Sequence, residues 1–310
     1  MDATDRIVGS VLGLALGDAL GAPFEGRMTE EVPDPLPALE LPWMGMPPGS
    51  TTDDTSMARN LVRSLAARGE LDPDDLVARH LEWFRSDPPV VGAFTRRVLS
   101  RVDRGEDAFE AATAVWEERG PEVSAGNGSV MYCAPLGLAY ADRAEELLDV
   151  APRLSALTHF DERCRTAVVA VTLTVAALAR GQSSEGAVTA ALAAVVDRDG
   201  WEELEYLVEM AGVGRRIDGP DQGFCLFTAG VGLQSLLGTG DFEAEVRRVV
   251  SLGGDTDTNA AVAGALLGAL VGEEGLPHAW LERLRDRTAI RAEALGLVTP
   301  ARRSNRSPEG

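Results

Sequence analysis

Apolar residues recur three and four positions apart along most of the chain, which is the spacing that places them on one face of a helix. The first such stretch runs from Ile7 to Leu20. Short Gly, Pro or Asp breaks separate the stretches, and convincing alternation with a period of two is absent. The pattern therefore predicts an all-α protein. The further predicted helices are Met57–Ala67, Pro73–Phe84, Phe94–Val102, Ala108–Glu118, Ala134–Ala141, Ala144–Leu157, Arg163–Ala179, Ser184–Val196, Trp201–Met210, Gly223–Leu237, Phe242–Ser251, Thr258–Leu270 and Pro277–Leu295.

Two of these stretches, Ala167–Leu178 and Ala260–Leu270, are apolar nearly all round. A helix without a polar face is buried, so we expect both at the centre of the fold with amphipathic helices around them. The chain contains no fixed-period repeat or low-complexity linker, and we expect one domain over residues 1–300. The proline-rich stretch Val32–Gly49 is predicted to cross the surface as a loop, and the polar tail 301–310 is predicted to be disordered.

The charge balance narrows the classes of partner. The 310 residues are 45% hydrophobic, enough for a substantial core, and carry a formal net charge of -20. The basic residues are all arginines. Nucleic-acid phosphates and anionic membranes are bound by clustered cations, so we expect neither partner.

The N-terminal stretch and the cysteines bear on the cellular location. The apolar run Ile7–Leu20 is interrupted by Asp18 and is shorter than the roughly 20 residues of a membrane-spanning helix, so we interpret it as a buried first helix. Cys133, Cys164 and Cys225 are odd in number and widely spaced. They are predicted to be buried free thiols of an intracellular, cytoplasmic protein.

A short acidic run near the start, Thr51–Thr55 (TTDDT), precedes a predicted helix. Thr and Asp side chains often cap helix N-termini, and capping is a sufficient explanation for a single run of this kind. The oxygens of Thr52, Asp53 and Asp54 are also hard ligands, which select magnesium, manganese or calcium over zinc.

A second run near the end, Gly253–Thr258 (GGDTDT), has the same chemistry. The two glycines permit an unusual backbone approach, and we expect Asp255 and Asp257 to project to one side of an extended segment before a helix begins at Thr258. A cap needs only one such side chain, so the redundancy favours a metal role. If folding brings the two runs together, they form a cage of oxygen ligands.

A glutamate follows the first predicted helix, in the segment Gly17–Gly26 (GDALGAPFEG). Glu25 stands there in a tight turn framed by Gly and Pro. It can be an ordinary surface-loop residue. Alternatively it is a general base or an orienter of an attacking water, a role that needs a carboxylate within hydrogen-bond reach of that water.

Two further motifs could bind a ligand. Residues 124–131 (SAGNGSVM) place glycines and small polar residues ahead of a helix, where successive backbone amides can turn toward a phosphate without any lysine. A simple interhelical turn is the alternative. His159 follows an apolar helix, and a lone histidine in that position is more often a hydrogen-bonded structural residue than a ligand or base.

Taken together and in this order, the five motifs resemble those of the ADP-ribosylglycohydrolase family. The chain carries GDALGAPFEG, TTDDTSM, GNGSVMYCAPLGL, LTHFDERC and GGDTDTNAAVAGALLGAL, and the resemblance spans residues 7 to about 272. It implies an orthogonal multi-helix bundle with two magnesium or manganese ions at the base of an ADP-ribose cleft. It also implies hydrolysis of the C1 glycosidic bond of an ADP-ribosyl group, carried by a protein side chain or a small compound, with release of ADP-ribose.

The resemblance assigns roles to individual residues. The metal ligands would be Thr52, Asp53, Asp54, Asp255, Asp257 and Thr258. The catalytic residues would be Glu25, Asp54 and Asp257. The substrate-binding residues would be Gly126, Asn127, Gly128, Ser129, Met131 and His159.

Two departures from the family pattern concern the substrate. Members that act on ADP-ribosylarginine commonly carry an acidic DxGN-type segment, whose Asp and Asn are Val90 and Ala93 here. A carboxylate recognises a guanidinium best, so arginine-linked substrates are less expected than serine-linked, O-acyl or free nucleotide-type ones. Tyr132 stands where an arginine is frequent, which removes a phosphate-facing cation or puts a stacking ring in its place.

Two other functions remain open on the sequence. The same metal site could serve a dinuclear hydrolase with a different glycosidic or phosphoester nucleotide substrate, as Val90 and Tyr132 suggest. The chain could also be a non-catalytic relative that binds ADP-ribose or another nucleotide ligand. The presence of Glu25 and of a full set of ligands speaks against that second alternative.

Overall fold

The computed structural model describes residues 1–209 and 216–298 of the chain. The predicted helix end at Met210 and the predicted disordered tail 301–310 lie outside these residues. Within them the regular structure is helical, with isolated β-bridges and no strand, so the all-α prediction is confirmed. The α-helices are α1 (Ala3–Gly21), α2 (Asp53–Arg68), α3 (Pro73–Arg85), α4 (Ala93–Val102), α5 (Ala108–Arg119), α6 (Ala134–Ala139), α7 (Leu147–Ala156), α8 (Glu162–Ala179), α9 (Ser184–Ala194), α10 (Trp201–Glu209), α11 (Cys225–Ser235), α12 (Phe242–Ser251), α13 (Thr256–Val271), α14 (His278–Arg283) and α15 (Arg287–Leu295).

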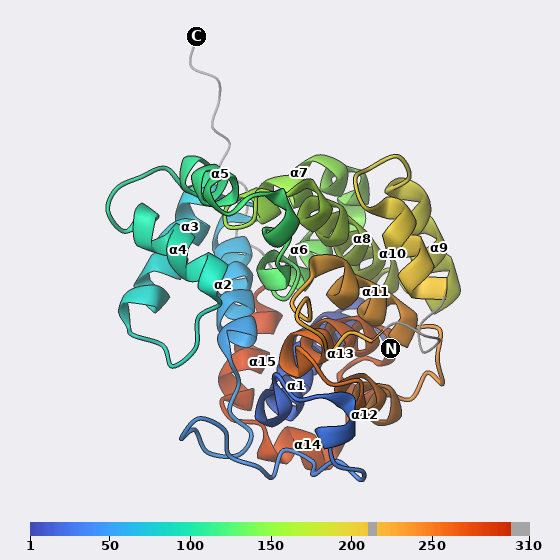
Figure 1. The fold of residues 1–310 in the computed structure, drawn as a ribbon. Helices are drawn as coiled ribbons and strands as arrows, with labels where there is room; N and C mark the ends of the chain where they lie inside the picture. Colours follow the sequence, from blue (N-terminus) through green and yellow to red (C-terminus); the bar gives the residue numbers. More distant parts are fainter. Residues whose placement is uncertain (210–215, 299–310) are drawn as a thin grey trace.

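Helices α1 and α13 lie side by side (Figure 1) and pack backbone against backbone. Glycines at every fourth position of α1 lie against the backbone of α13. A Cβ atom added at Gly13 would lie 2.2 Å from the carbonyl oxygen of Gly264, and one added at Gly17 would lie 1.9 Å from that of Ala260. Later residues of α1 meet earlier residues of α13, so the two helices are antiparallel. The C-terminal end of α1 therefore meets the N-terminal end of α13, where Gly21 lies against Asp257.

The helices predicted to be central are buried. In α13 all residues from Thr256 to Ala269 are buried, and α8 is buried over most of its length. Helix α1 is long and apolar enough to span a membrane by length and composition, but 89% of its most apolar window is buried inside the protein. It packs here as a core helix, in agreement with the sequence interpretation. The predicted loop Val32–Gly49 contains no helix in the structure and leads to the start of α2.

Several helix boundaries differ from the sequence predictions, and two of the differences affect the fold or the acidic run. The predicted helix Pro277–Leu295 is broken into α14 and α15, because Asp286 adopts a left-handed conformation with φ 55° and the amide of Arg285 donates to the carbonyl of Gly49 at 3.0 Å. Helix α13 begins at Thr256 and not at Thr258. Asp257 therefore stands in the first helical turn, and the prediction of an extended segment through Asp257 is wrong.

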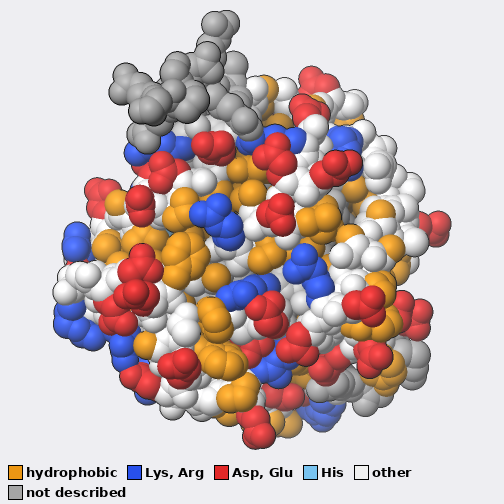
Figure 2. All heavy atoms as spheres, turned by 90° about the horizontal axis from the view of Figure 1, so that it is seen from above, with side chains coloured by type: hydrophobic (Ala, Val, Ile, Leu, Met, Phe, Trp, Pro, Cys, Tyr) orange, Lys and Arg blue, Asp and Glu red, His pale blue; other side chains and the backbone are white. Residues whose placement is uncertain are grey.

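The surface carries both signs of charge. On the face shown in Figure 2, arginine side chains are interspersed with Asp and Glu side chains. In the described part of the chain many arginines form ion pairs at the surface, for example Arg85 with Asp103 at 2.6 Å. Such exposed pairs contribute little to stability, typically about 0–1 kcal/mol each.

Candidate functional site

The ends of α1, α2 and α13 meet at a pocket of about 200 Å³. Its wall includes acidic side chains from three separate segments, two small-residue loops and one histidine. The residues that line it are Glu25, Asp53, Asp54, Val90, Gly92, Ala93, Phe94, Thr95, Gly126, Asn127, Gly128, Met131, His159, Asp255, Asp257 and Thr258. Folding thus places the two acidic runs around one pocket, along with Glu25, the 126–131 loop and His159.

Asp18 fixes the start of α2 against α1. None of the sequence motifs indicated it as a site residue. Its buried carboxylate accepts from the amides of Thr52 at 3.0 Å and Thr55 at 3.1 Å, and from the Thr55 hydroxyl at 2.5 Å. Burial raises the pKa of Asp18 to about 6, although these hydrogen bonds lower it. A signal for this role was present in the sequence, because a charged residue inside an otherwise apolar helix is expensive to bury without such partners.

The four aspartates of the two runs are held in different ways. Asp53 and Asp54 occupy the first turn of α2, behind the N-cap Thr52. One oxygen of Asp53 accepts from the amide of Gly92 at 3.0 Å. One oxygen of Asp255 accepts from the side-chain amide of Asn127 at 2.9 Å. By contrast, the Oδ1 atoms of Asp54 and Asp257 are buried and have no hydrogen-bond partner.

The electrostatics of this cluster disfavour several charges at once. Burial raises the pKa of Asp53, Asp54 and Asp257, and the neighbouring carboxylates raise each of them further. Glu25 is partly exposed, yet the burial of its carboxyl and the proximity of Asp255 and Asp53 raise its pKa to about 7. Without a compensating cation the site carries a large cost in repulsion and desolvation.

A divalent metal ion is the natural compensating cation for such a set of carboxylates. As positioned, no group of three His, Cys, Asp or Glu side chains in residues 1–209 and 216–298 is arranged to hold a metal. The chemistry of the donors nevertheless fits hard cations, since two buried carboxylate oxygens point at no protein donor and mutual repulsion is unrelieved. A cation placed among Asp53, Asp54, Asp255 and Asp257 would satisfy both deficits. Thr258 lines the same pocket, whereas Thr52 lines the neighbouring one.

The loop that carries Glu25 is fastened to the segment before α13. The amide of Gly26 donates to the carbonyl of Gly254, and the amide of Gly254 donates to the carbonyl of Arg27, both at 2.8 Å. Further along, the amide and hydroxyl of Thr29 donate to Asp218 at 2.7 and 2.9 Å. These bonds hold Glu25 beside Asp255. No pattern in the sequence pointed to Asp218, because its partner lies 189 residues away.

The 126–131 loop forms another part of the pocket wall. Gly126, Asn127, Gly128 and Met131 line the pocket, as expected. Ser129 does not, since it is fully buried and its hydroxyl bonds that of Ser155 at 2.9 Å. A Cβ atom at Gly128 would lie 2.6 Å from the His159 ring, so only glycine leaves room there.

His159 and Tyr132 are both buried, and only the histidine reaches the pocket. The His159 ring stacks on Phe94 with a centroid distance of 4.8 Å, and burial lowers its pKa to about 3, so it is neutral at physiological pH. The Tyr132 ring is fully buried and packs edge-on against His80 at 5.4 Å. Of the two alternatives for Tyr132, a ring that stacks on the ligand is therefore wrong, and the loss of a phosphate-facing cation is the one that stands.

Comparisons with known proteins agree with the motifs. The ADP-ribosylglycohydrolase family model matches residues 1–306. The chain is 30% identical over 284 residues to the ADP-ribosyl-[dinitrogen reductase] glycohydrolase of Rhodospirillum rubrum, covering 90% of each protein. It is 29% identical over 328 residues to ADP-ribosylhydrolase ARH3 of Gallus gallus, covering 89% of this chain and 88% of the relative. It is 24% identical over 314 residues to the ADP-ribosylarginine hydrolase Tri1 of Serratia proteamaculans (strain 568), covering 96% and 81%. A solved structure described as an ADP-ribosylglycohydrolase-related protein complex matches with a TM-score of 0.80 and 35% identity, covering 96% of this chain and 98% of that one.

Proposed function

The chain belongs to the ADP-ribosylglycohydrolase family of hydrolases, and on this premise we propose that it hydrolyses the C1 glycosidic bond of an ADP-ribosyl group in a metal-dependent reaction. The observation that carries the proposal is the pocket in which Asp53, Asp54, Asp255 and Asp257 converge with Glu25. The aspartates come from the N-terminal ends of two helices far apart in the sequence, and a capping role alone would not place them around one cavity.

Two magnesium or manganese ions are the proposed cofactors, held by Thr52, Asp53 and Asp54 on one side and by Asp255, Asp257 and Thr258 on the other. When bound, such ions would supply positive charge that orients the ribose hydroxyls and polarises the attacking water. The unpaired Oδ1 atoms of Asp54 and Asp257 are the donors best explained by this role.

The residues of the chain would divide the remaining work. Hydrolysis at C1 develops positive charge on the sugar, which the carboxylates of Asp54 and Asp257 would favour. Glu25 lines the same pocket from a separate, fastened loop, which suits a base that takes a proton from the attacking water. Gly126, Asn127, Gly128 and Met131 of the loop and the neutral His159 would hold the distal part of the ADP-ribose.

We further propose that arginine-linked substrates are disfavoured. The pocket wall at positions 90–93 offers Val90, Gly92 and Ala93, and none of these can pair with a guanidinium. The Asp53 oxygen that faces this wall already accepts from the amide of Gly92 at 3.0 Å.

The test is ADP-ribose release from serine-linked, arginine-linked and O-acetyl ADP-ribose with Mg2+ or Mn2+, with and without chelator. The proposal requires release that chelator abolishes and that Asp257→Ala abolishes as well. Asp142→Ala serves as the matched control, because this exposed carboxylate lines a separate pocket. If neither metal nor ADP-ribose shifts the melting temperature at saturation, and no substrate is turned over, the assignment of the site is wrong.

A further inference from the structure

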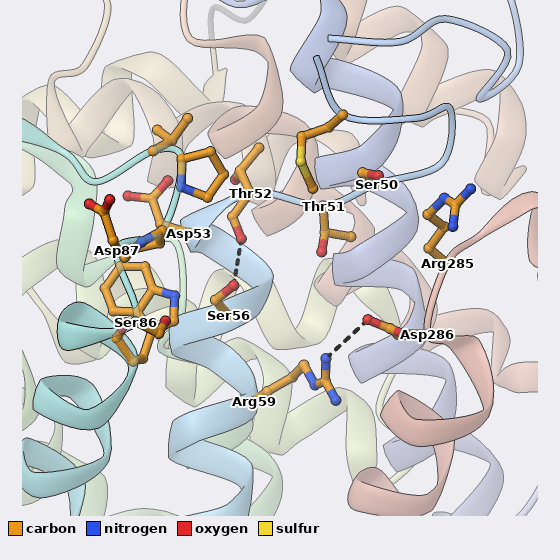
Figure 3. A pocket seen from close by; sticks show the side chains of 15 residues that line it. Ser50, Thr51, Thr52, Asp53, Ser56, Arg59, Ser86, Asp87, Arg285 and Asp286 are labelled. Atoms are coloured by element: carbon orange, nitrogen blue, oxygen red, sulfur yellow. Dashed lines mark hydrogen bonds and ion pairs between the residues drawn. The ribbon is translucent and has the colours of Figure 1, made fainter. Parts of the chain in front are cut away.

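A second and larger pocket opens beside the acidic one. It has a volume of about 520 Å³ and shares Asp53 and Val90 with the 200 Å³ pocket, so the two adjoin at these residues. Figure 3 shows its walls, which come from the loop before α2 and the first turns of α2, from the end of α3 and the loop after it, and from Arg285 and Asp286. Apart from Thr52, Asp53 and Val90, none of its lining residues belongs to the proposed metal and ADP-ribose site.

A third pocket of about 300 Å³ continues the second one. The two share Ser56, Arg59, Trp83 and Ser86. The three pockets are thus connected in series by shared lining residues, and we call the second and third together the α2 groove.

The α2 groove follows one face of helix α2. The α2 residues that line it are Asp53, Ser56, Arg59, Asn60 and Arg63, which are spaced three and four apart and so share a face. From Asp53 to Arg63 the helix rises about 15 Å, at 1.5 Å per residue. An extended polypeptide of four or five residues covers about that distance, at roughly 3.3 Å per residue.

The lining of the groove suits a polypeptide. Trp83 offers a partly buried indole, and Ser56 and Ser86 offer hydroxyls. Two groups in it have unused hydrogen-bonding capacity. The Ser50 hydroxyl is buried without a partner, and the Arg285 side chain makes no ion pair or side-chain hydrogen bond with any described residue. The other cation in Figure 3, Arg59, is already engaged by Glu293 at 2.8 Å and by Asp286 at 3.8 Å.

The position of the groove indicates which part of a substrate it receives. If ADP-ribose binds as proposed, its C1 atom lies at the aspartates and its distal part lies along the 126–131 loop. The substituent on C1 must then leave the acidic pocket by another route. The α2 groove adjoins the acidic pocket at Asp53 and Val90, so a substituent that leaves on this side enters the groove.

We propose that the α2 groove binds the polypeptide to which the ADP-ribosyl group is attached, with the modified residue at the Asp53 and Val90 junction and its neighbours along α2. This inference rests on the proposed function. What it adds is the surface, outside the acidic pocket, that contacts the residues on either side of the modified one.

The experiment compares two substrates with the same scissile bond. One is a single amino acid carrying ADP-ribose, and the other is a peptide of about ten residues with the same modified residue at its centre; the linkage is the one that the wild-type protein hydrolyses. The peptide is expected to have a kcat/KM about tenfold higher, mainly through KM, which corresponds to about 1.4 kcal/mol of added binding.

Three variants test whether the groove is the cause. Ser86→Trp places a bulky side chain where the second and third pockets join, and Trp83→Ala and Arg285→Ala remove individual contacts. Each should lower the ratio of the two kcat/KM values toward one. Gln182→Trp, at an exposed position between α8 and α9, is the matched control and should keep the wild-type ratio. Because both substrates are measured on the same preparation, the ratio does not depend on the folded fraction.

The outcomes separate the two proposals. Release from both substrates with equal kcat/KM, or equal losses for both in the groove variants, leaves the hydrolase function standing and overturns the groove assignment. Hydrolysis of O-acetyl ADP-ribose alone overturns it as well. If the wild-type protein hydrolyses no ADP-ribosyl compound, the proposed function fails and the groove assignment fails with it.

Discussion

Replacing Gly17 by alanine should push the two central helices apart. The added Cβ atom would lie 1.9 Å from the carbonyl oxygen of Ala260 and 2.4 Å from its carbonyl carbon, whereas ordinary contact begins near 3.4 Å. Both contacts are to backbone, which cannot rotate out of the way. The helices α1 and α13 must therefore separate locally by about 1.5 Å.

The expected cost follows from two opposing effects. Overpacking a core costs about 1–3 kcal/mol and occasionally more, and a contact with backbone belongs at the upper end of that range. Alanine is favoured over glycine inside a helix by about 1 kcal/mol. We expect Gly17→Ala to lower the free energy of unfolding by about 2 kcal/mol or more. Since α13 carries Asp257 in its first turn, the same separation should weaken metal binding.

The measurement is urea-induced unfolding followed by circular dichroism, with and without Mn2+. Gly186→Ala is the matched control, because Gly186 lies in the exposed helix α9 and its added Cβ would meet only the Ser183 hydroxyl, at 3.1 Å. It should leave stability unchanged or raise it slightly. A Gly17→Ala protein that unfolds at the wild-type urea concentration would refute the argument that backbone contact between α1 and α13 positions the site.

Three further predictions concern the site itself. Asp257→Asn removes one of several buried like charges, so in EDTA at pH 8 it should raise the free energy of unfolding by about 1 kcal/mol or more. The same variant should lose the rise in melting temperature that Mn2+ causes in the wild-type protein. A metal response that persists would count against Asp257 as a ligand. Burial raises the pKa of Asp18 from 3.8 to about 6 and that of Glu25 from 4.5 to about 7. The metal-free protein therefore loses stability as the pH rises from these unfolded values to the folded ones, on the order of 3 kcal/mol for Asp18 alone, and a bound cation offsets that loss. The stabilisation by Mn2+ should therefore grow from pH 5 to pH 8. It is measured at each pH as the difference in melting temperature with and without Mn2+, so that the titration of histidines cancels. A difference that stays flat or shrinks would contradict the raised pKa values. Asp218→Asn should slow ADP-ribose release about threefold or more by loosening the loop of Glu25, with little change in melting temperature, whereas Glu30→Gln should not. Arg216 donates to both Asp218 and Glu30, at 2.8 Å each, but only Asp218 also accepts from the backbone of the loop.

The candidate site residues could be predicted from the sequence because the two acidic runs contain more carboxylates than helix capping requires. Two acidic runs with more carboxylates than a helix cap needs, and a glycine-rich loop before a helix, were informative without any structure. The structure places Asp53, Asp54, Asp255 and Asp257 around one pocket and adds Glu25 from a third segment. The sequence could not predict that Ser129 and Tyr132 point away from the pocket. Neighbouring residues in a loop can point to opposite sides, and only the packing of the folded chain decides which of them line the pocket.

The sequence by itself determined the helical class of the fold, the central helices and the chemistry of the acidic cluster, because helical periodicity and ligand type are local properties of a short segment. Tertiary structure alone decided how Asp18 clamps the start of α2, how Asp218 fastens the loop of Glu25, and that a groove leaves the site along α2. Each of these depends on segments that are distant in the chain and meet only because α1 and α13 pack backbone against backbone or because loops close over their ends. No local pattern encodes such distances, so the geometry of the site became visible only in the folded protein.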